Sequence, residues 1–274
     1  MNDFIHPIPE AIDLYEEGDL NNLDIADVGE YLQEKTHIPF RIGGNVYERF
    51  SEKRIEKTSR ELAGIRVRDP GKRFISGFPF QAEVDYEKRR IRDPEWKIFG
   101  ILYEGVLYQR IISDLVIKKG SGLKQCILVF TNQLFGTWDE YNGRYHARVS
   151  LYGFPSLISI TGLVEAPAKP KEFYVKKQMG TPAAWLKEEY QGRFLDHGDR
   201  RTTEVLKGYA MQALLFHLTG DPFCEEEDCR LFNGHWQEEV LHSQLDGRYD
   251  FCPRHDFMLN QLRGRNRSGR GAVR

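Results

Sequence analysis

The chain has 274 residues, long enough to bury one large core or one domain with a small appendage, so its stability needs no disulfide framework. Charged residues make up 29% and hydrophobic residues 40%, and the net charge of −2 predicts neither a nucleic-acid nor a membrane partner for the main body. The N-terminus lacks the basic start and apolar run of a signal peptide, and no segment has the roughly 18 apolar residues of a membrane span. We therefore expect a cytoplasmic protein whose cysteines stay reduced.

The first part of the chain shows short strand and helix patterns. Residues 11–15 alternate like a strand, and residues 24–35 have the apolar spacing of a helix with Asp24 as its N-cap. Residues 39–47 indicate a strand and a turn. These patterns favour an α/β layer.

A charged segment and a buried core follow. Residues 51–94 are rich in charge, and residues 87–97 are expected to be exposed. Residues 96–117 indicate a largely buried helix, whereas the apolar run at 124–132 indicates a buried strand that contains Cys126 as a small hydrophobic residue. Two more extended segments are expected within residues 144–164, interrupted at Pro155.

After the proline-rich connection at 165–171 the pattern is helical to the end of the chain. The longest helix is predicted over 202–220, capped by Thr202 or Thr203 and ended by Gly220 and Pro222. A second helix is predicted over 233–245. The last dozen residues hold five arginines, three glycines and no acid, so we expect a single domain over 1–260 and a disordered basic tail over 261–274.

Three of the four cysteines and three of the eight histidines lie between residues 224 and 255. Cys224 and Cys229 form one closely spaced pair, and Cys252 and His255 form another at the spacing of a zinc knuckle. Four such ligands close a zinc tetrahedron and leave no position for water or substrate. The pattern thus predicts one structural zinc ion, worth about 10 kcal/mol by analogy with zinc fingers. The alternative is that these residues are neighbours by chance.

Four acids fill the loop between the first two cysteines: Glu225, Glu226, Glu227 and Asp228. Their field should raise the pKa values of the thiols and also attract a dication. We expect metal binding to prevail and the loop to form an acidic protrusion on the surface.

From His217 onward the sequence resembles the archaemetzincins, which are zinc metallopeptidases with an H-E-x-x-H-x-x-G helix, a C-x-x-x-x-C-x-M segment and a later C-x-x-C pair. The positions that follow this pattern are His217, Gly220, Cys224, Cys229, Cys252 and His255. Residues 129–170 also resemble archaeal metallopeptidase-like proteins. The resemblance implies an α/β fold of the α+β kind, with a metzincin-like mixed sheet, packed helices and a zinc-stapled helical region at 217–258.

The resemblance fails where catalysis would occur. Ala213 and Leu214 stand at the positions of the first histidine and the general-base glutamate, Phe223 stands near the third ligand, and Leu231 replaces the methionine. A zinc hydrolase needs three protein ligands and a carboxylate that takes the proton from the bound water. The family's catalytic site is therefore not carried over, and a second, catalytic zinc ion is doubtful.

Other residues could rebuild a site. His217, His235, Glu239 and His242 are the weak catalytic candidates, because a helix over 233–245 places the last three along one face. The alternative is that they are polar residues of a half-exposed helix. His146 and Glu165 are weaker still.

Two functional classes remain open. One is a divergent zinc metallopeptidase, and the other is a non-catalytic pseudo-peptidase that keeps a cleft and binds a peptide or protein. No nucleic-acid site is predicted in the main body. The arginines of the tail could contact phosphates, but a solvated terminus without a partner is the simpler interpretation.

Overall fold

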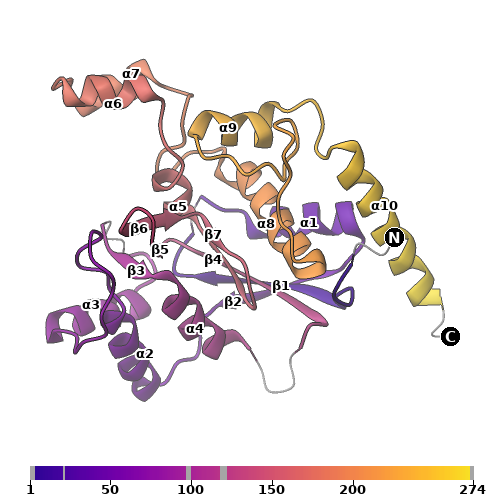
Figure 1. The fold of residues 1–274 in the computed structure, drawn as a ribbon. Coiled ribbons are helices and arrows are strands. Elements are labelled where there is room, and N and C mark those ends of the chain that lie inside the picture. Colours follow the sequence, from indigo (N-terminus) through magenta and orange to yellow (C-terminus); the bar gives the residue numbers. More distant parts are fainter. Residues whose placement is uncertain (1–3, 21, 97–99, 118–121, 272–274) are drawn as a thin grey trace.

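The computed structural model describes residues 4–20, 22–96, 100–117 and 122–271 (Figure 1), without the side chains of 266–271. In chain order, the elements are β1 Ala11–Glu17, α1 Ile25–Thr36, β2 Phe40–Asn45, α2 Glu52–Gly64, α3 Gln81–Arg92, β3 Leu102–Glu104, α4 Gly105–Val116, β4 Gln125–Thr131, β5 Leu134–Asp139, β6 Arg144–Arg148, β7 Ser150–Leu151, β8 Ser156–Ser159, α5 Ile160–Glu165, α6 Lys171–Gln178, α7 Ala183–Glu189, α8 Thr202–Thr219, α9 Gln237–Leu241, the π-helix η1 His242–Asp246 and α10 Pro253–Gly271. The predicted α/β class is confirmed.

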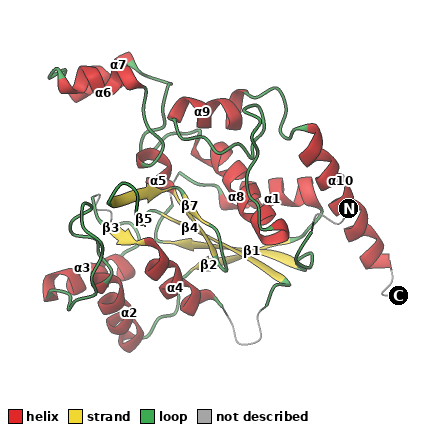
Figure 2. Cartoon of the chain, in the orientation of Figure 1, coloured by secondary structure: helices red, strands yellow, loops and turns green. Residues whose placement is uncertain are grey.

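The main sheet has the strand order β2-β1-β4-β8-β7. Figure 2 shows the strands in yellow, with α1 and α8 on one side and α4 on the other. The first four strands are parallel, and β7 at the end of the sheet runs antiparallel to β8. The predicted strand at 124–132 is confirmed as β4, and Cys126 is buried within it. Because the sheet ends at β7, the outer edge of that strand carries no partner from the main sheet.

Each face of the main sheet carries its own apolar core. Leu128 and Phe130 pack into the cluster that includes α1 and α8, whereas Ile127 and Val129 pack into the cluster that includes α4. Successive residues of a strand point to opposite faces, so a continuous apolar run is what a strand covered on both sides requires. The continuous apolar pattern of this segment therefore reflects burial on both faces.

The predictions for the first helix are confirmed. α1 begins after Asp24, whose side chain accepts a hydrogen bond from the backbone N–H of Asp27 at 3.0 Å. The Oγ1 atom of Thr203 accepts a further bond from the Asp24 N–H at 3.0 Å. Thr203 thus supports the start of α1, and the prediction that Thr202 or Thr203 caps α8 is wrong: the N-cap is Arg201, without a side-chain capping bond.

The predicted single helix over 96–117 is also wrong within the described residues. Leu102–Glu104 forms β3, which pairs in parallel with β5, and α4 begins only at Gly105. The Glu104 side chain accepts from the Leu107 N–H at 2.7 Å and caps this helix. Strand pairing with a distant segment therefore overrides the apolar periodicity before Gly105.

Two other segments differ from expectation near the C-terminus. The helix predicted over 233–245 is shorter, because α9 begins at Gln237 and continues as η1. α10 continues to Gly271, so the described part of the predicted disordered tail is helical; residues 272–274 lie outside the described residues. α6 and α7 project from the body (Figure 1) and share a small hydrophobic cluster with the residues that follow them.

No helix in the described part combines the length and the apolar character that crossing a bilayer requires.

The charged segment before Trp96 is not fully exposed, contrary to prediction. Glu87 and Arg90 of α3 are buried. The two side chains are paired, since Arg90 Nε donates to Glu87 Oε2 at 2.9 Å, and Arg90 Nη1 also donates to Glu17 Oε1 at 2.5 Å. Burial of a charge is tolerated where it is paired and hydrogen-bonded.

Glu17 lies at the carboxyl end of β1 and is completely buried. Besides Arg90, its carboxylate accepts hydrogen bonds from the hydroxyl groups of Tyr47 and Tyr108, each at 2.5 Å, and from Thr131. Burial acts to raise the pKa of Glu17, but Arg90 and the three hydroxyl donors outweigh it, so the pKa lies below its ordinary value. The ionised carboxylate is therefore the form that stabilises the fold.

The substitution Glu17→Gln should lower the free energy of unfolding by about 3–5 kcal/mol, because it removes one of the two carboxylates paired with the buried Arg90 and weakens the hydrogen bonds of three hydroxyl donors. Urea denaturation at pH 7 measures the change. Since the folded pKa is depressed, the contribution of Glu17 is present above its unfolded pKa and is lost as pH falls through the folded pKa. The difference between wild type and variant should shrink on acidification. Glu52→Gln, which removes an exposed pair with Arg92, is the control, and equal effects of both variants would contradict this account.

Candidate functional site

The structure brings together the four residues predicted to bind zinc. Cys224 and Cys229 lie in the loop after α8, Cys252 directly precedes α10, and His255 is in its first turn. All four are buried, and their ligand atoms lie within 4.8 Å of one another. In the described part of the chain this is the only His, Cys, Asp and Glu group with metal-binding geometry.

The spacing of the ligand atoms fits one tetrahedral ion. The Sγ atoms of Cys224 and Cys252 are 3.8 Å apart, and His255 Nδ1 is 3.8 Å from Cys229 Sγ and 3.1 Å from Cys252 Sγ. A tetrahedron with zinc–sulfur bonds of about 2.3 Å has sulfur–sulfur edges of about 3.8 Å. The donor set is therefore suited to zinc and is closed to a water ligand.

The backbone around the first cysteine pair holds it in a tight loop. Cys224 N donates to Leu231 O at 2.9 Å, and Cys229 N donates to Glu226 O at 3.0 Å. The Glu226 N–H points at Cys224 Sγ at 3.4 Å, and the Cys252 N–H points at Cys229 Sγ at 3.5 Å. Such N–H groups stabilise thiolates, so the loop is organised to hold deprotonated sulfur.

In the metal-free protein, the pKa shift of His255 favours metal binding, whereas the pKa shifts of Cys224 and Cys229 oppose it. Burial raises the pKa of the Cys229 thiol to about 12 and also raises the pKa of Cys224. Burial lowers the pKa of His255, which keeps its imidazole neutral and able to coordinate. A bound zinc ion would have to displace the thiol protons, and this coupling links metal binding to pH.

The acidic loop is more ordered than the sequence suggests. The Asp228 side chain is only 13% exposed and accepts from His242 Nε2 at 3.0 Å and from Arg248 Nε at 2.5 Å. Glu226 accepts from the Tyr249 hydroxyl at 2.7 Å. The other two acids of the loop are exposed. Of the four acids in the expected protrusion, Asp228 is thus paired with the cation of Arg248, and Glu226 accepts a hydrogen bond from a neutral hydroxyl.

The weak catalytic candidates are not assembled. His217 is buried, and its Nε2 donates to the backbone carbonyl of Leu123 at 2.9 Å. Burial lowers its pKa, so it is a neutral structural residue. Glu239 accepts from the backbone N–H groups of His235 and Trp236, at 2.7 and 3.0 Å, and caps α9. His242 pairs with Asp228. Of the four candidates, only His235 lines the cavity beside α8 that is described below.

The rotation of α8 explains where His217 points. Tyr209, Gln212 and Phe216 form one face of this helix, where Phe216 stacks on Tyr152 with ring centroids 5.6 Å apart. Gln212 accepts from the Tyr152 hydroxyl at 2.8 Å and donates to Phe232 O at 3.1 Å. A catalytic helix would present metal ligands on the face toward the cavity, whereas the residue of α8 that lines the cavity is Tyr209.

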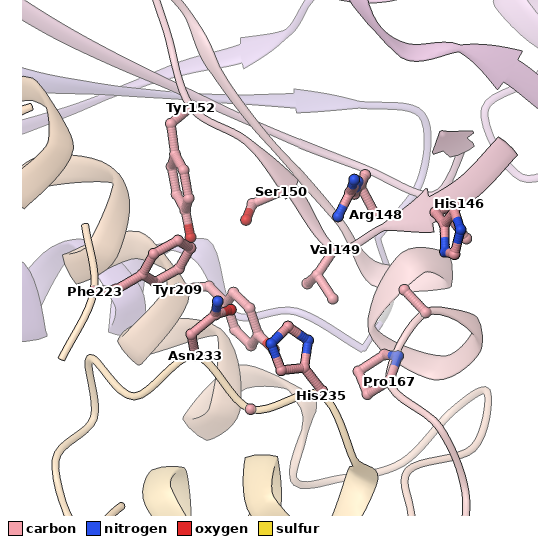
Figure 3. A pocket seen from close by; sticks show the side chains of 13 residues that line it. His146, Arg148, Val149, Ser150, Tyr152, Pro167, Tyr209, Phe223, Asn233 and His235 are labelled. Atoms are coloured by element: carbon pink, nitrogen blue, oxygen red, sulfur yellow. The ribbon is translucent and has the colours of Figure 1, made fainter. Parts of the chain in front are cut away.

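The cavity lies between this helix and the strand segment that leads from β6 into β7 (Figure 3). Its volume is about 270 Å³. The residues that line it are His146, Ala147, Arg148, Val149, Ser150, Tyr152, Ala166, Pro167, Tyr209, Phe223, Asn233, Gly234 and His235. Neither aspartate nor glutamate is among them. Ala213 and Leu214, at the aligned positions of the family's histidine and glutamate, are buried in the apolar core instead.

Sequence reasoning missed most of this cavity. His146 was only a weak candidate, and it pairs with Asp139 at 3.3 Å, whereas Glu165 pairs with His197 at 3.7 Å away from the cavity lining. Arg148 was not singled out. The one available signal was the alternation of His146 and Arg148 on a predicted strand, which places both side chains on the same face.

The chain is similar to solved structures of peptidases and to the sequence model of one protein family. The chain is similar to a zinc-dependent peptidase from Methanocorpusculum labreanum (16% identity, TM-score 0.41, 91% of this chain and 100% of the other covered). It is also similar to archaemetzincin from Methanopyrus kandleri (12% identity, TM-score 0.43, 93% and 95% covered). No curated protein matches. The sequence model of a family described as "Probable metallopeptidase family (DUF6775)" matches residues 8–262, which is most of the chain. The protein therefore belongs to this metallopeptidase family, as its sequence resemblance predicted.

Proposed function

We propose that the protein is a non-catalytic, peptide-binding member of its metallopeptidase family and that one structural zinc ion holds its C-terminal region together. The observation that carries this proposal is the composition of the cavity beside α8, which has no carboxylate among its lining residues. Zinc-dependent peptide hydrolysis needs three protein ligands on the ion and a carboxylate that accepts a proton from water. His146 and His235 alone do not supply this set.

Peptide binding is supported by the position of the cavity. It adjoins β7, the last strand of the main sheet, whose backbone groups on the outer edge can pair with an extended chain. The cavity is small for a ligand pocket and suits one or two side chains of such a peptide. An edge strand that supplies backbone hydrogen bonds, with an adjoining pocket for a side chain, is a common mode of peptide recognition.

The structural role of the zinc ion follows from what its ligands connect. Cys224 and Cys229 follow α8, while Cys252 and His255 belong to the start of α10. Arg263 of α10 donates to the carbonyl of Lys35 in α1 at 2.9 Å. One ion would therefore fasten α10 to the helical layer on the main sheet, and the closed donor set supplies no site for a substrate.

A divergent metallopeptidase is the second candidate, and the family description favours it. It would require a second metal ion held by residues such as His217, His235 and Glu239. In the structure each of these already has another partner or lies apart from the others. A catalytic role for them therefore requires a rearrangement of both α8 and α9.

Protein purified without a chelator should contain one zinc ion per chain, measured by elemental mass spectrometry. Cys229→Ser should lose the zinc and reduce the free energy of unfolding by about 3 kcal/mol or more, because zinc binding contributes directly to folding. Cys126→Ala, at a buried cysteine outside the cluster, is the control that should keep the zinc. Zinc-free wild-type protein, or a Cys229→Ser variant with unchanged zinc and stability, would remove the proposed staple.

A peptide-library cleavage assay should show no turnover with zinc, manganese or cobalt added in turn. The expected reason is that the cavity lining offers two imidazoles but neither a third metal ligand of the usual kind nor a carboxylate base for a metal-bound water. The same library should give measurable binding without cleavage. Turnover that is abolished by Glu239→Gln or His217→Ala would favour the second candidate, and turnover that survives both variants would place catalysis at other residues.

A further inference from the structure

We infer that the cavity beside α8 selects an anionic group of its peptide ligand, namely a carboxylate from an Asp or Glu side chain or from the C-terminus. This inference rests on the proposed function and adds the chemistry of the ligand to it. The lining residues include one arginine, two histidines and several neutral hydrogen-bond donors, and no acid. A site with this composition is complementary to a carboxylate.

Arg148 is the residue with the fixed positive charge. Its Nε donates to Thr137 Oγ1 at 2.8 Å, which holds the side chain across the β5–β6 pair. Among the described residues, it has no acidic partner within ion-pair distance. The terminal N–H groups of its guanidinium are therefore left for water or a ligand, and a guanidinium can bind a carboxylate through two parallel hydrogen bonds.

The backbone of Arg148 is held in place by close packing. A Cβ atom placed on Gly162 would lie 2.2 Å from the Arg148 carbonyl oxygen, so α5 approaches the strand closely at this glycine. Phe135 of β5 is its partner in the antiparallel register. The cation thus projects from a rigid element, which lowers the entropic cost of holding a ligand.

The opposite wall supplies neutral donors. Figure 3 shows Asn233 and His235 across the cavity from Arg148 and His146. The Asn233 amide and the imidazoles can each donate an N–H group. Burial raises the pKa of the Tyr209 hydroxyl, which stays protonated as a further donor.

Two acids that contact the lining histidines do not themselves line the cavity. Asp139 pairs with His146 at 3.3 Å and also accepts from the side chain of Asn142 at 2.7 Å. Glu239 accepts from the backbone N–H of His235. Since these carboxylates are engaged outside the lining, the charge that a ligand meets inside it comes from Arg148.

Fluorescence anisotropy with labelled ten-residue peptide pools of degenerate sequence tests this inference. The first pool has one internal Asp and an amidated C-terminus, the second has Asn in place of Asp, and the third has Asn and a free C-terminal carboxylate. At least one carboxylate-bearing pool should bind about tenfold or more tightly than the all-amide pool, because a hydrogen bond to a charged group is involved. The pool that gains affinity identifies the source of the carboxylate.

Arg148→Gln should abolish this preference, and Arg148→Lys should restore only part of it, since a lysine cannot form the paired hydrogen bonds. Arg110→Gln on the exposed side of α4 makes the same charge change and should have no effect. Thermal melting should show that all three variants remain folded. Equal binding of the three pools by wild type would overturn the inference and leave the proposed function intact, whereas no binding of any pool would overturn both.

Discussion

The fold depends on one buried carboxylate, that of Glu17, at the carboxyl end of β1, an inner strand of the main sheet. Removing a charge from water costs several kcal/mol, so Glu17 is tolerable only while its hydrogen-bond donors stay in place. Those donors come from the turn after β2 (Tyr47), from α3 (Arg90), from α4 (Tyr108) and from the end of β4 (Thr131). Arg90 also donates to Glu87, which accepts a hydrogen bond at 2.7 Å from the hydroxyl group of Tyr103 in the second sheet, β3-β5-β6. The two sheets and the helices between them are therefore mutually dependent.

On the other face of the main sheet, α8 combines two roles. Most of its residues are buried in the larger apolar core, and its end at Gly220, with a φ of 76°, releases the chain into the cysteine loop. The four cysteine and histidine side chains that could hold a metal ion begin with Cys224 in this loop, at the margin of the core. A closed Cys and His cluster can serve there as a covalent-like link between the end of α8 and α10, without any demand on the residues that face the cavity.

The distinction between a peptidase and a binding protein depends on the rotation of this helix. Neighbouring residues of an α-helix point in directions about 100° apart, so Phe216 contacts Tyr152 beside the cavity while His217 turns toward Leu123. A metallopeptidase resemblance at the level of sequence is thus compatible with a cavity that carries no metal ligands on its helical side. The remaining wall holds Arg148 and two histidines, and this composition is the basis for the proposed recognition of a negative group.

Local signals in the sequence determined β1, β4, the capped start of α1, the end of α8 and the two closely spaced residue pairs of the cysteine and histidine cluster. These features depend on residue periodicity, capping and short spacing, which neighbours along the chain decide. Only the tertiary structure decided that residues 102–104 pair as a strand, that Glu87 and Arg90 are buried, and that His217 points away from the cavity. The cavity itself joins residues from 146 to 235, and no local pattern specifies how a helix rotates against a sheet or which distant strands pair, because both depend on packing across the whole core.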